Sequence, residues 1–201
     1  MKKYKEMERI IIDKESIDAI EEDIIIRRGI ERYMYVRQFV YGNVLDIASG
    51  VGYGSYLMSK NPDVKTVTGV DKSEHALENA RNSFDKENVR FVLGSPETVT
   101  GDFDILVCLE TVEHLPDPKV LKEMVDRCNI DEVVISFPHK KTTHYNKYHL
   151  WDFTQEDICR IFNDFECYRV YELHDSTIMN FVRIRREGYT YPRRYFGEKK
   201  E

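Results

Sequence analysis

Two carboxylates and an imidazole lie close together in the stretch ETVEHL, residues 110–115. Glu110, Glu113 and His114 follow the spacing i, i+3 and i+4, so they share one face if a helical turn forms there. Imidazole titrates near neutral pH and can take up a proton, and a mixed carboxylate and imidazole set can bind a divalent cation. The stretch therefore indicates a site for proton transfer or for a metal ion.

Three further histidines, His139, His144 and His149, recur at intervals of five in HKKTTHYNKYHLWDFT, residues 139–154. This interval matches neither the helical repeat near 3.6 nor the strand repeat of 2, so an irregular segment is expected. Irregular segments longer than about 12 residues in compact domains are often functional. We interpret residues 138–153 as a loop that binds the substrate, in which His139 and His144 are adequately explained as exposed loop residues.

A glycine-rich turn follows the first strand-like run in VLDIASGVGYGS, residues 44–55. Glycines permit tight turns and a close approach of the backbone to a ligand. A dinucleotide fingerprint would require glycine at position 55, where Ser55 stands, and a P-loop is excluded because the G-K-[ST] signature is missing. Asp46 precedes the turn, and its carboxylate repels a pyrophosphate but suits a ligand with a cationic amino group and a sulfonium centre.

A second acid, Asp71, ends the strand-like run TVTGVD about twenty residues later, where a carboxylate can accept hydrogen bonds from both hydroxyls of a ribose. Adenosine with a positively charged tail fits both acids. The alternative is an α/β domain whose glycines only turn the chain and whose acids cap helices.

The elements that would position these residues alternate between short apolar runs and amphipathic stretches of helical length. This alternation predicts an α/β, Rossmann-like, doubly wound and mostly parallel sheet of seven strands. Two last strand-like runs, joined by a short DS connection, predict a C-terminal antiparallel hairpin. The supporting pairs are NVLDIA and YGSYLMSK, TVTGVD and SEHALENARNSF, FDILVCL and PKVLKEMVDRC, DEVVISF and TQEDICRIF, then ECYRVYELH and TIMNFVRIR.

A length of 201 residues predicts one domain. Its expected parts are a helical cap (1–41), a cofactor-binding core (42–137), an acceptor loop (138–153), a C-terminal helix and hairpin (154–186) and a tail (187–201).

Composition narrows the partners and the compartment. The net charge of −6 argues against binding nucleic acid over the whole surface, although arginines and lysines crowd the C-terminal end, where a solvated tail is the plainer explanation. The four cysteines form no C-x-x-C pair and follow no signal peptide, which favours reduced thiols in the cytoplasm. Apolar runs fall short of the roughly 18–20 residues of a membrane span.

The chain resembles the class I S-adenosylmethionine-dependent methyltransferases over roughly residues 30–185. LDIASGVGYGS, TGVD, VRFVLGS and FDILVCLETVEHL carry the resemblance. It implies S-adenosylmethionine as cofactor, with Asp46 and the glycine turn at its methionine portion, Asp71 at its ribose and Ser95 at its adenine. The full implied cofactor set is Arg32, Tyr33, Asp46, Ala48, Gly50, Gly52, Asp71, Lys72, Ser95, Pro96, Leu109 and Glu110.

Two positions depart from the usual pattern of this family. Ala48 replaces the frequent first glycine of the turn, a change that a small side chain can accommodate. Ser95 and Pro96 stand where an acid and a residue with a free N–H often meet adenine, and proline donates no hydrogen bond.

Two closer resemblances compete. RY at 32–33, ETVEHLPDP, SFP and NKYHLWDFT are similar to methyltransferases of polysaccharide and natural-product biosynthesis. E-x-x-E-H with a later histidine resembles the 2′-O-methyltransferases of small-RNA 3′ ends, which implies Glu110, Glu113, His114 and His149 as ligands of Mg²⁺ or Mn²⁺. Without a metal, the two histidines would orient the substrate or the loop by hydrogen bonds.

These observations predict a methyl transfer to oxygen, with His114 as the first candidate base, His149 as the second and Glu113 beside them. The expected acceptor is a sugar hydroxyl of a glycan precursor or a similar small metabolite. The alternatives are an RNA 2′-hydroxyl and a non-catalytic S-adenosylmethionine-binding subunit. The sequence does not indicate an oligomeric state.

Overall fold

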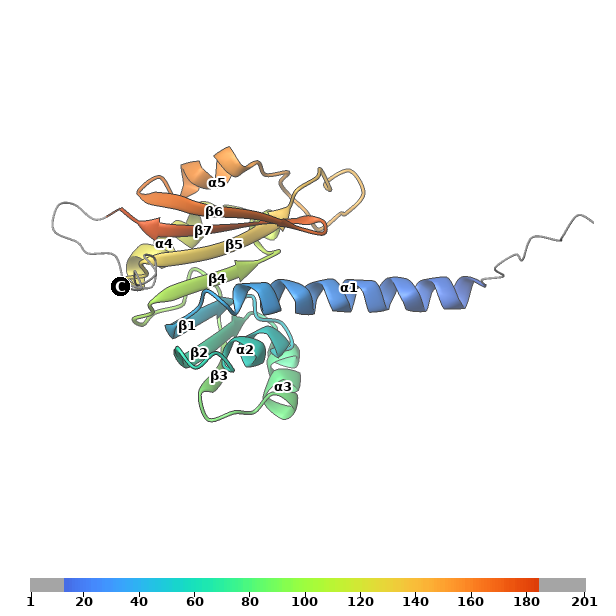
Figure 1. Cartoon of the computed structure of the whole chain (residues 1–201), viewed down its shortest axis with the longest axis horizontal. Helices are drawn as coiled ribbons and strands as arrows, with labels where there is room; N and C mark the ends of the chain where they lie inside the picture. Colours follow the sequence, from blue (N-terminus) through green and yellow to red (C-terminus); the bar gives the residue numbers. More distant parts are fainter. Residues whose placement is uncertain (1–12, 185–201) are drawn as a thin grey trace, which may run out of the picture.

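A computed structural model describes residues 13–184, so the predicted tail (187–201) and the last two residues of the predicted hairpin segment lie outside the described residues. Seven strands form one sheet in the order β3-β2-β1-β4-β5-β7-β6, and only β7 runs antiparallel to its neighbours (Figure 1). The predicted mostly parallel sheet with a C-terminal antiparallel hairpin is confirmed. The strands are β1 (Gly42–Ile47), β2 (Val64–Asp71), β3 (Val89–Leu93), β4 (Ile105–Leu109), β5 (Glu132–Pro138), β6 (Phe165–Leu173) and β7 (Ser176–Arg183).

Helices cover both faces of the sheet. Neighbouring residues of a strand point to opposite faces, so apolar strand residues pack against helices on either side. Leu45 of β1 belongs to a core that includes residues of α4 and α5, whereas Val44 belongs to a second core with residues of α1 and α2. The helices are α1 (Lys14–Val36), α2 (Tyr53–Met58), α3 (Glu74–Ser83), α4 (Lys119–Arg127) and α5 (Gln155–Ile161), with one 3₁₀ turn at Val112–His114.

Strand order reverses between β1 and β4, because the chain first adds β2 and β3 on one side of β1 and then β4 and β5 on the other. In open α/β sheets ligands bind outside the carboxyl ends of the strands at such a switch point. The fold therefore directs attention to the ends of β1 and β4.

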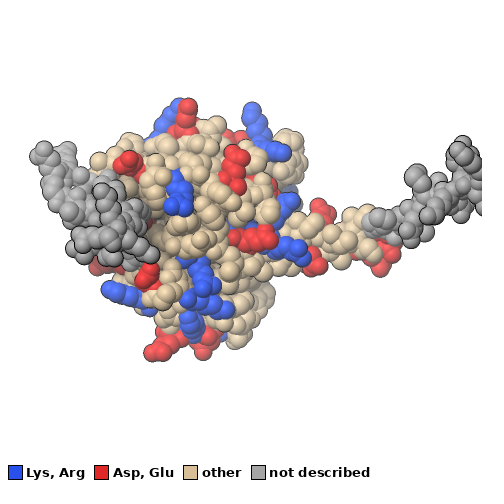
Figure 2. Space-filling model, in the orientation of Figure 1, with Lys and Arg blue, Asp and Glu red and all other residues tan. Residues whose placement is uncertain are grey.

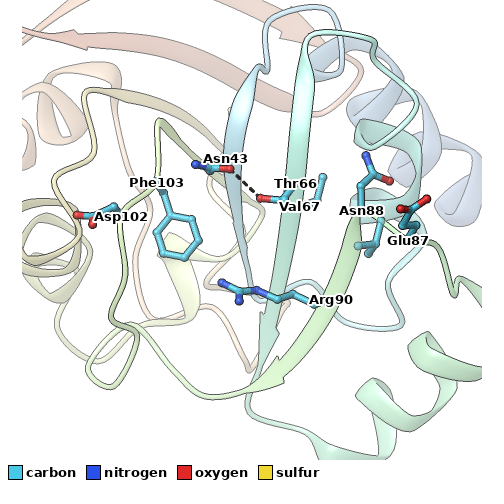
Figure 3. A pocket seen from close by; sticks show the side chains of 9 residues that line it. Asn43, Thr66, Val67, Glu87, Asn88, Arg90, Asp102 and Phe103 are labelled. Carbon is cyan, nitrogen blue, oxygen red and sulfur yellow. Dashed lines mark hydrogen bonds between the residues drawn. The ribbon is translucent and has the colours of Figure 1, made fainter.

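A hollow of about 280 Å³ lies at the opposite, amino end of β1, β2 and β3 (Figure 3). Thr66 donates a hydrogen bond to Asn43 across its floor at 3.0 Å. None of the predicted site residues lines this hollow, so it is separate from the candidate site. Its lining residues are Asn43, Thr66, Val67, Glu87, Asn88, Val89, Arg90, Asp102 and Phe103.

The predicted N-terminal cap is one long helix in its described part. Asp13 caps α1 by accepting a hydrogen bond from the backbone N–H of Ser16, and Gly29, Tyr33 and Val36 of its second half are buried. The first half of α1 extends away from the body (Figure 1). No helix within residues 13–184 combines the length and the apolar character that crossing a membrane requires.

Candidate active site

The carboxyl edge of the sheet gathers the predicted site residues from separate parts of the chain. β1 ends at Ile47 before the glycine turn, β2 ends at Asp71, and β4 ends at Leu109 before Glu110. β5 ends at Pro138, where the predicted acceptor loop begins. Parallel strands thus bring these four segments to one edge, as the sequence predicted.

The glycine turn adopts a backbone that favours glycine at several positions. Ala48, Gly50 and Gly52 have φ values of 58°, 55° and 88°, in the left-handed region. A Cβ added to Gly52 would lie 2.7 Å from the Cβ of Ala80, whereas one added to Gly50 would meet nothing within 4 Å. Gly52 therefore allows α3 to pack against the turn, and Gly50 leaves the outer side of the turn open to a ligand.

Asp46 lies beneath this turn and is completely buried. Its two carboxylate oxygens accept hydrogen bonds from the hydroxyls of Tyr33 at 3.1 Å and Ser55 at 2.6 Å. Burial raises the pKa of Asp46 from 3.8 to about 7, although both hydroxyls oppose the rise. Asp46 thus joins α1 to the glycine turn and can act on a ligand through its charge more than through direct contact.

Asp71 has a different environment at the end of β2. One carboxylate oxygen accepts the backbone N–H of Gly50 at 2.8 Å, and the other accepts that of Ser73 at 2.9 Å. The side chain remains partly exposed, and Lys72 beside it is exposed. Asp71 therefore holds the glycine turn in place while keeping a face toward solvent.

The predicted adenine segment follows β3. The backbone N–H of Ser95 donates to the Thr98 hydroxyl at 2.9 Å, and the carbonyl of buried Pro96 accepts from Arg127 of α4. Internal hydrogen bonds thus fix this short connection, and Ser95 remains partly accessible.

Glu110 begins the turn after β4 with φ of 48°, outside the 3₁₀ turn that contains Glu113 and His114. Its carboxylate accepts a hydrogen bond from the Ser136 hydroxyl at 2.7 Å. Burial raises the pKa of Glu110, and the Arg32 guanidinium opposes that rise. The prediction that Glu110 shares a helical face with Glu113 and His114 is therefore wrong, because the helical turn starts only after Glu110.

Glu113, His114 and His149 come together, and one ligand atom from each lies within 4.8 Å of the others. Glu113 is 1% exposed, and neither of its carboxylate oxygens has a hydrogen-bond partner within the described residues. Burial and then the neighbouring Glu110 raise the pKa of Glu113 from 4.5 to about 8. A buried carboxylate without partners is costly, so this group suits a site where a ligand supplies positive charge or a hydrogen bond.

The two imidazoles meet edge to face with ring centroids 4.6 Å apart. The His114 Nδ1 donates to the Tyr148 carbonyl at 2.9 Å, because a carbonyl can only accept, and the His114 Nε2 lies 4.0 Å from Glu113. The His149 Nδ1 lies 2.6 Å from the Thr142 hydroxyl. Burial and then His114 lower the pKa of His149.

The predicted acceptor loop is irregular but firmly organised. Asp152 accepts hydrogen bonds from the backbone N–H groups of Thr142 and Thr143 at 2.7 and 3.1 Å, and these bonds with the Thr143 hydroxyl lower the pKa of Asp152. The Trp151 indole N–H donates to the Leu115 carbonyl at 2.8 Å. The loop is thus tied to the turn after β4, which explains how His149 reaches His114.

The organising role of Asp152 escaped the sequence analysis, which assigned this residue only to the motif around His149. An acid at the end of a loop rich in threonine is a weak signal, because the hydrogen bonds depend on how the loop folds back. His139 and His144 lie outside the cluster of Glu113, His114 and His149, as expected.

A second hollow, of about 530 Å³, lies beside this loop. It is bounded by the end of β5, the start of α5 and the β6–β7 hairpin. Its lining residues are Phe137, His139, Phe153, Thr154, Gln155, Glu156, Glu172 and Thr177.

Known proteins share the domain and the fold. Residues 44–129 match a family described as "Methyltransferase domain". Over 91 residues the chain is 35% identical to a ubiquinone biosynthesis O-methyltransferase of Coxiella burnetii, and the match covers 43% of this chain and 37% of that relative. The chain therefore matches little more than a third of the relative's length.

Solved structures extend the similarity beyond the matched segment. A putative methyltransferase in complex with the Trm112 activator, from Haloferax volcanii, has a TM-score of 0.69 at 12% identity, covering 87% of this chain and 99% of that one. Magnesium protoporphyrin IX methyltransferase from Synechocystis, with bound S-adenosylmethionine, has a TM-score of 0.61 at 18% identity, covering 88% and 87%. These structures confirm the predicted Rossmann-like α/β fold, and the methyltransferase domain match covers residues 44–129.

Proposed function

We propose that this chain, whose residues 44–129 match the methyltransferase domain family, binds S-adenosylmethionine and methylates a hydroxyl oxygen of a small metabolite. One observation carries the proposal. A glycine turn that is open at Gly50 lies at the same sheet edge as His114, whose Nε2 forms no hydrogen bond within residues 13–184.

The residues of the turn fit this cofactor. Gly50 leaves room for a ligand, and Asp71 has a partly exposed carboxylate for ribose hydroxyls. Arg32 lies close enough to Glu110 to act on its pKa, and it can hold the carboxylate of a methionine portion. When bound, S-adenosylmethionine would supply an electrophilic methyl group on a sulfonium centre.

His114 is the proposed base. Because its Nδ1–H donates to the Tyr148 carbonyl, the neutral ring has its lone pair on Nε2 and can accept the proton of an acceptor hydroxyl. Burial raises the pKa of Glu113 beside it to about 8, so Glu113 carries little negative charge at neutral pH. His149, packed against His114, is the second candidate.

The acceptor is proposed to be a ring-bearing small molecule with a hydroxyl, such as a sugar of a glycan precursor. Tyr145 and Tyr148 of the loop are 71% and 65% exposed, and Trp151 is also exposed. Aromatic side chains can stack on the faces of rings, and the hollow beside the loop gives space for the rest of an acceptor. The similarity to an enzyme named for O-methylation in ubiquinone biosynthesis supports an oxygen acceptor.

Calorimetry with S-adenosylhomocysteine tests the cofactor site. We expect binding by the unmodified chain and a loss of about tenfold or more for Asp71→Asn, since a hydrogen bond to a charged group contributes about 1.5–3 kcal/mol. Glu78→Gln, on the exposed side of α3, is the matched control and should bind like the unmodified chain. Tighter binding of NAD than of S-adenosylhomocysteine would contradict the proposal.

A panel of hydroxylated acceptors then tests the reaction. Transfer of a labelled methyl group to nucleotide sugars or phenols, with loss in His114→Ala, would support the proposed acceptor class and base. Binding of S-adenosylmethionine without transfer to any acceptor would favour a non-catalytic binding subunit.

A metal-dependent RNA 2′-O-methyltransferase is the second candidate. In the described part of the chain, neither oxygen of Glu113 has a hydrogen-bond partner, and Glu113 lies beside His114 and His149. Mg²⁺ or Mn²⁺ would be held by Glu113, His114 and His149, whose ligand atoms lie within 4.8 Å of one another. These atoms would have to move closer together to place an ion at about 2.0–2.3 Å from each of them. A bound ion would lower the pKa of a coordinated hydroxyl. Glu110 would first have to leave Ser136 to join this set.

Calorimetric measurement of Mn²⁺ binding distinguishes the small-metabolite enzyme from the RNA enzyme. His149→Ala should abolish Mn²⁺ binding, and His144→Ala, a histidine of the same loop outside the cluster, should preserve it. Methyl transfer to RNA 3′ ends that requires Mn²⁺ and fails with chelator would favour the RNA enzyme. Transfer to a sugar that is unchanged by chelator would favour the small-metabolite enzyme.

A further inference from the structure

The first half of α1 exposes a row of isoleucines that no other part of residues 13–184 covers. Ile17, Ile20, Ile24, Ile25 and Ile26 are each between 43% and 63% exposed. Every residue from 13 to 27 is exposed, and this half extends from the body as a stem (Figures 1 and 2). Exposed apolar clusters of this kind mark interaction sites, and a short isolated helix is marginal in water without a packing partner.

The direction of this stem is fixed by contacts of its second half. Arg28 forms a 3.0 Å ion pair with Asp175 in the β6–β7 turn, and Glu31 pairs with His174 of the same turn. A Cβ on Gly29 would lie 2.6 Å from the Tyr53 hydroxyl, so glycine here permits close packing on α2. The helix continues unbroken through Gly29, so these contacts set the direction in which the stem leaves the body.

Acidic and basic side chains of α1 lie toward opposite ends of the helix. Residues 14–23 contain five acids and one lysine, whereas residues 24–32 contain three arginines and one glutamate. Helices that lie on membrane surfaces are typically rich in lysine and arginine on their polar face, so the acidic stem does not suit an anionic lipid surface. The separation does suit a helix of the same kind that runs in the opposite direction.

We propose that α1 pairs with α1 of a second copy of this chain in an antiparallel, twofold-symmetric dimer. Ile17, Ile20 and Ile24 follow the i, i+3, i+7 spacing of a helix-pairing seam. Antiparallel pairing brings the acidic end of each helix toward the exposed Arg27 of the other, whereas parallel pairing places like charges side by side. A twofold axis across the stem uses the same surface, Ile17, Ile20 and Ile24, on both copies.

Sedimentation of the full chain tests the dimer. The unmodified chain should sediment as a dimer, and Ile20→Glu combined with Ile24→Glu should raise the dimer dissociation constant by at least about 30-fold, as expected for losing a buried anchor. Val170→Glu on β6 is the matched control, because Val170 and Ile24 are both 43% exposed, and it should remain dimeric. A monomeric unmodified chain at about 100 µM would overturn the proposal.

Circular dichroism and cooperative thermal unfolding of the double variant show that its body is folded. A folded double variant that still dimerises like the unmodified chain would also overturn the proposal. The proposal does not depend on the function proposed above.

Salt dependence tests the orientation. Raising NaCl from about 50 to about 500 mM should weaken an antiparallel dimer several-fold, since salt screens attraction between its opposite charges. Arg27→Glu should weaken the dimer at low salt and make it less sensitive to salt, whereas Lys65→Glu on β2 should change neither property. A dimer that tightens with salt would refute the antiparallel arrangement.

Discussion

Replacing Asp46 by asparagine should remove much of the dependence of folding stability on pH. Asp46 is completely buried, and burial raises its pKa from 3.8 to about 7. The folded chain therefore holds this proton more tightly than the unfolded chain does. The resulting stabilisation is fully present below about pH 4 and is lost as the pH rises through about 7.

The size of the effect follows from the shift in pKa. One pKa unit corresponds to about 1.4 kcal/mol, so a rise of about three units amounts to about 4 kcal/mol between the acidic and the alkaline limits. Asp46→Asn keeps the shape of the side chain and cannot ionise. Its carbonyl can accept from one of the hydroxyls of Tyr33 and Ser55, and its amide N–H can donate to the other.

Urea unfolding of both proteins at several values from pH 5 to pH 8.5 measures this effect. Asp46→Asn should be within about 1 kcal/mol of the unmodified chain at pH 5 and more stable by a few kcal/mol at pH 8.5. The difference between the two curves isolates Asp46, because the buried Glu113, with its pKa near 8, contributes equally to both. A difference that stays constant across this range would refute the reasoning, and Glu78→Gln should show no such change.

Four further predictions concern single side chains of the site. Ala48→Gly should raise the free energy of unfolding by about 1 kcal/mol, since φ at this position is 58°, and thermal unfolding measures it. Glu113→Gln should abolish any Mn²⁺ binding in calorimetry while preserving S-adenosylhomocysteine binding; retained Mn²⁺ binding would exclude Glu113 as a ligand. Arg32→Ala should weaken S-adenosylhomocysteine binding, and unchanged affinity would remove it from the site. Trp151→Phe removes the bond to the Leu115 carbonyl and should raise KM for the acceptor without changing cofactor affinity; an altered cofactor affinity alone would contradict a role in the loop.

The sheet and the glycine turn were predictable because local patterns determine them. Runs of apolar residues between amphipathic stretches specified the parallel strands, and their order in the chain placed Asp46, Asp71 and Glu110 at one edge. The left-handed backbone at Gly50 and Gly52 was likewise expected from the glycines themselves. These features depend on residues that are neighbours in sequence or on general rules of chain connection.

The arrangement around Glu113 was only partly predictable, because it depends on contacts between distant segments. The spacing of Glu110, Glu113 and His114 suggested a common face, but the left-handed backbone at Glu110 turns its carboxylate to Ser136 of β5. His149 reaches His114 because Asp152 folds the loop and Trp151 anchors it. Spacing alone does not determine such contacts, since an irregular loop has no period.

The sequence did not predict that α1 projects from the body. An apolar helical pattern predicts that a helix face is buried but does not indicate which surface covers it. The sequence predicted a helical cap over residues 1–41, and the structure buries residues only in the second half of α1. An amphipathic pattern is satisfied equally by an intramolecular and an intermolecular contact. A second chain therefore explains a pattern that the fold of one chain leaves exposed.

Two buried carboxylates, Asp46 and Glu113, lie at the same sheet edge, and burial raises the pKa of both even though Arg32 opposes the rise at Glu113. Burial alone would keep both carboxyl groups largely neutral near pH 6.5. A neutral carboxyl group costs less free energy to bury than a charged one, but it attracts a cationic ligand less strongly. A positive charge that binds nearby lowers their pKa values, so binding should release protons. Asp46 ionises as the pH rises from 6 to 8. The preference for S-adenosylmethionine over neutral S-adenosylhomocysteine should therefore increase over this range. Calorimetry in buffers of different ionisation enthalpy counts the released protons. A count near zero for both ligands would mean that Asp46 supports the turn without acting on the charge of the cofactor.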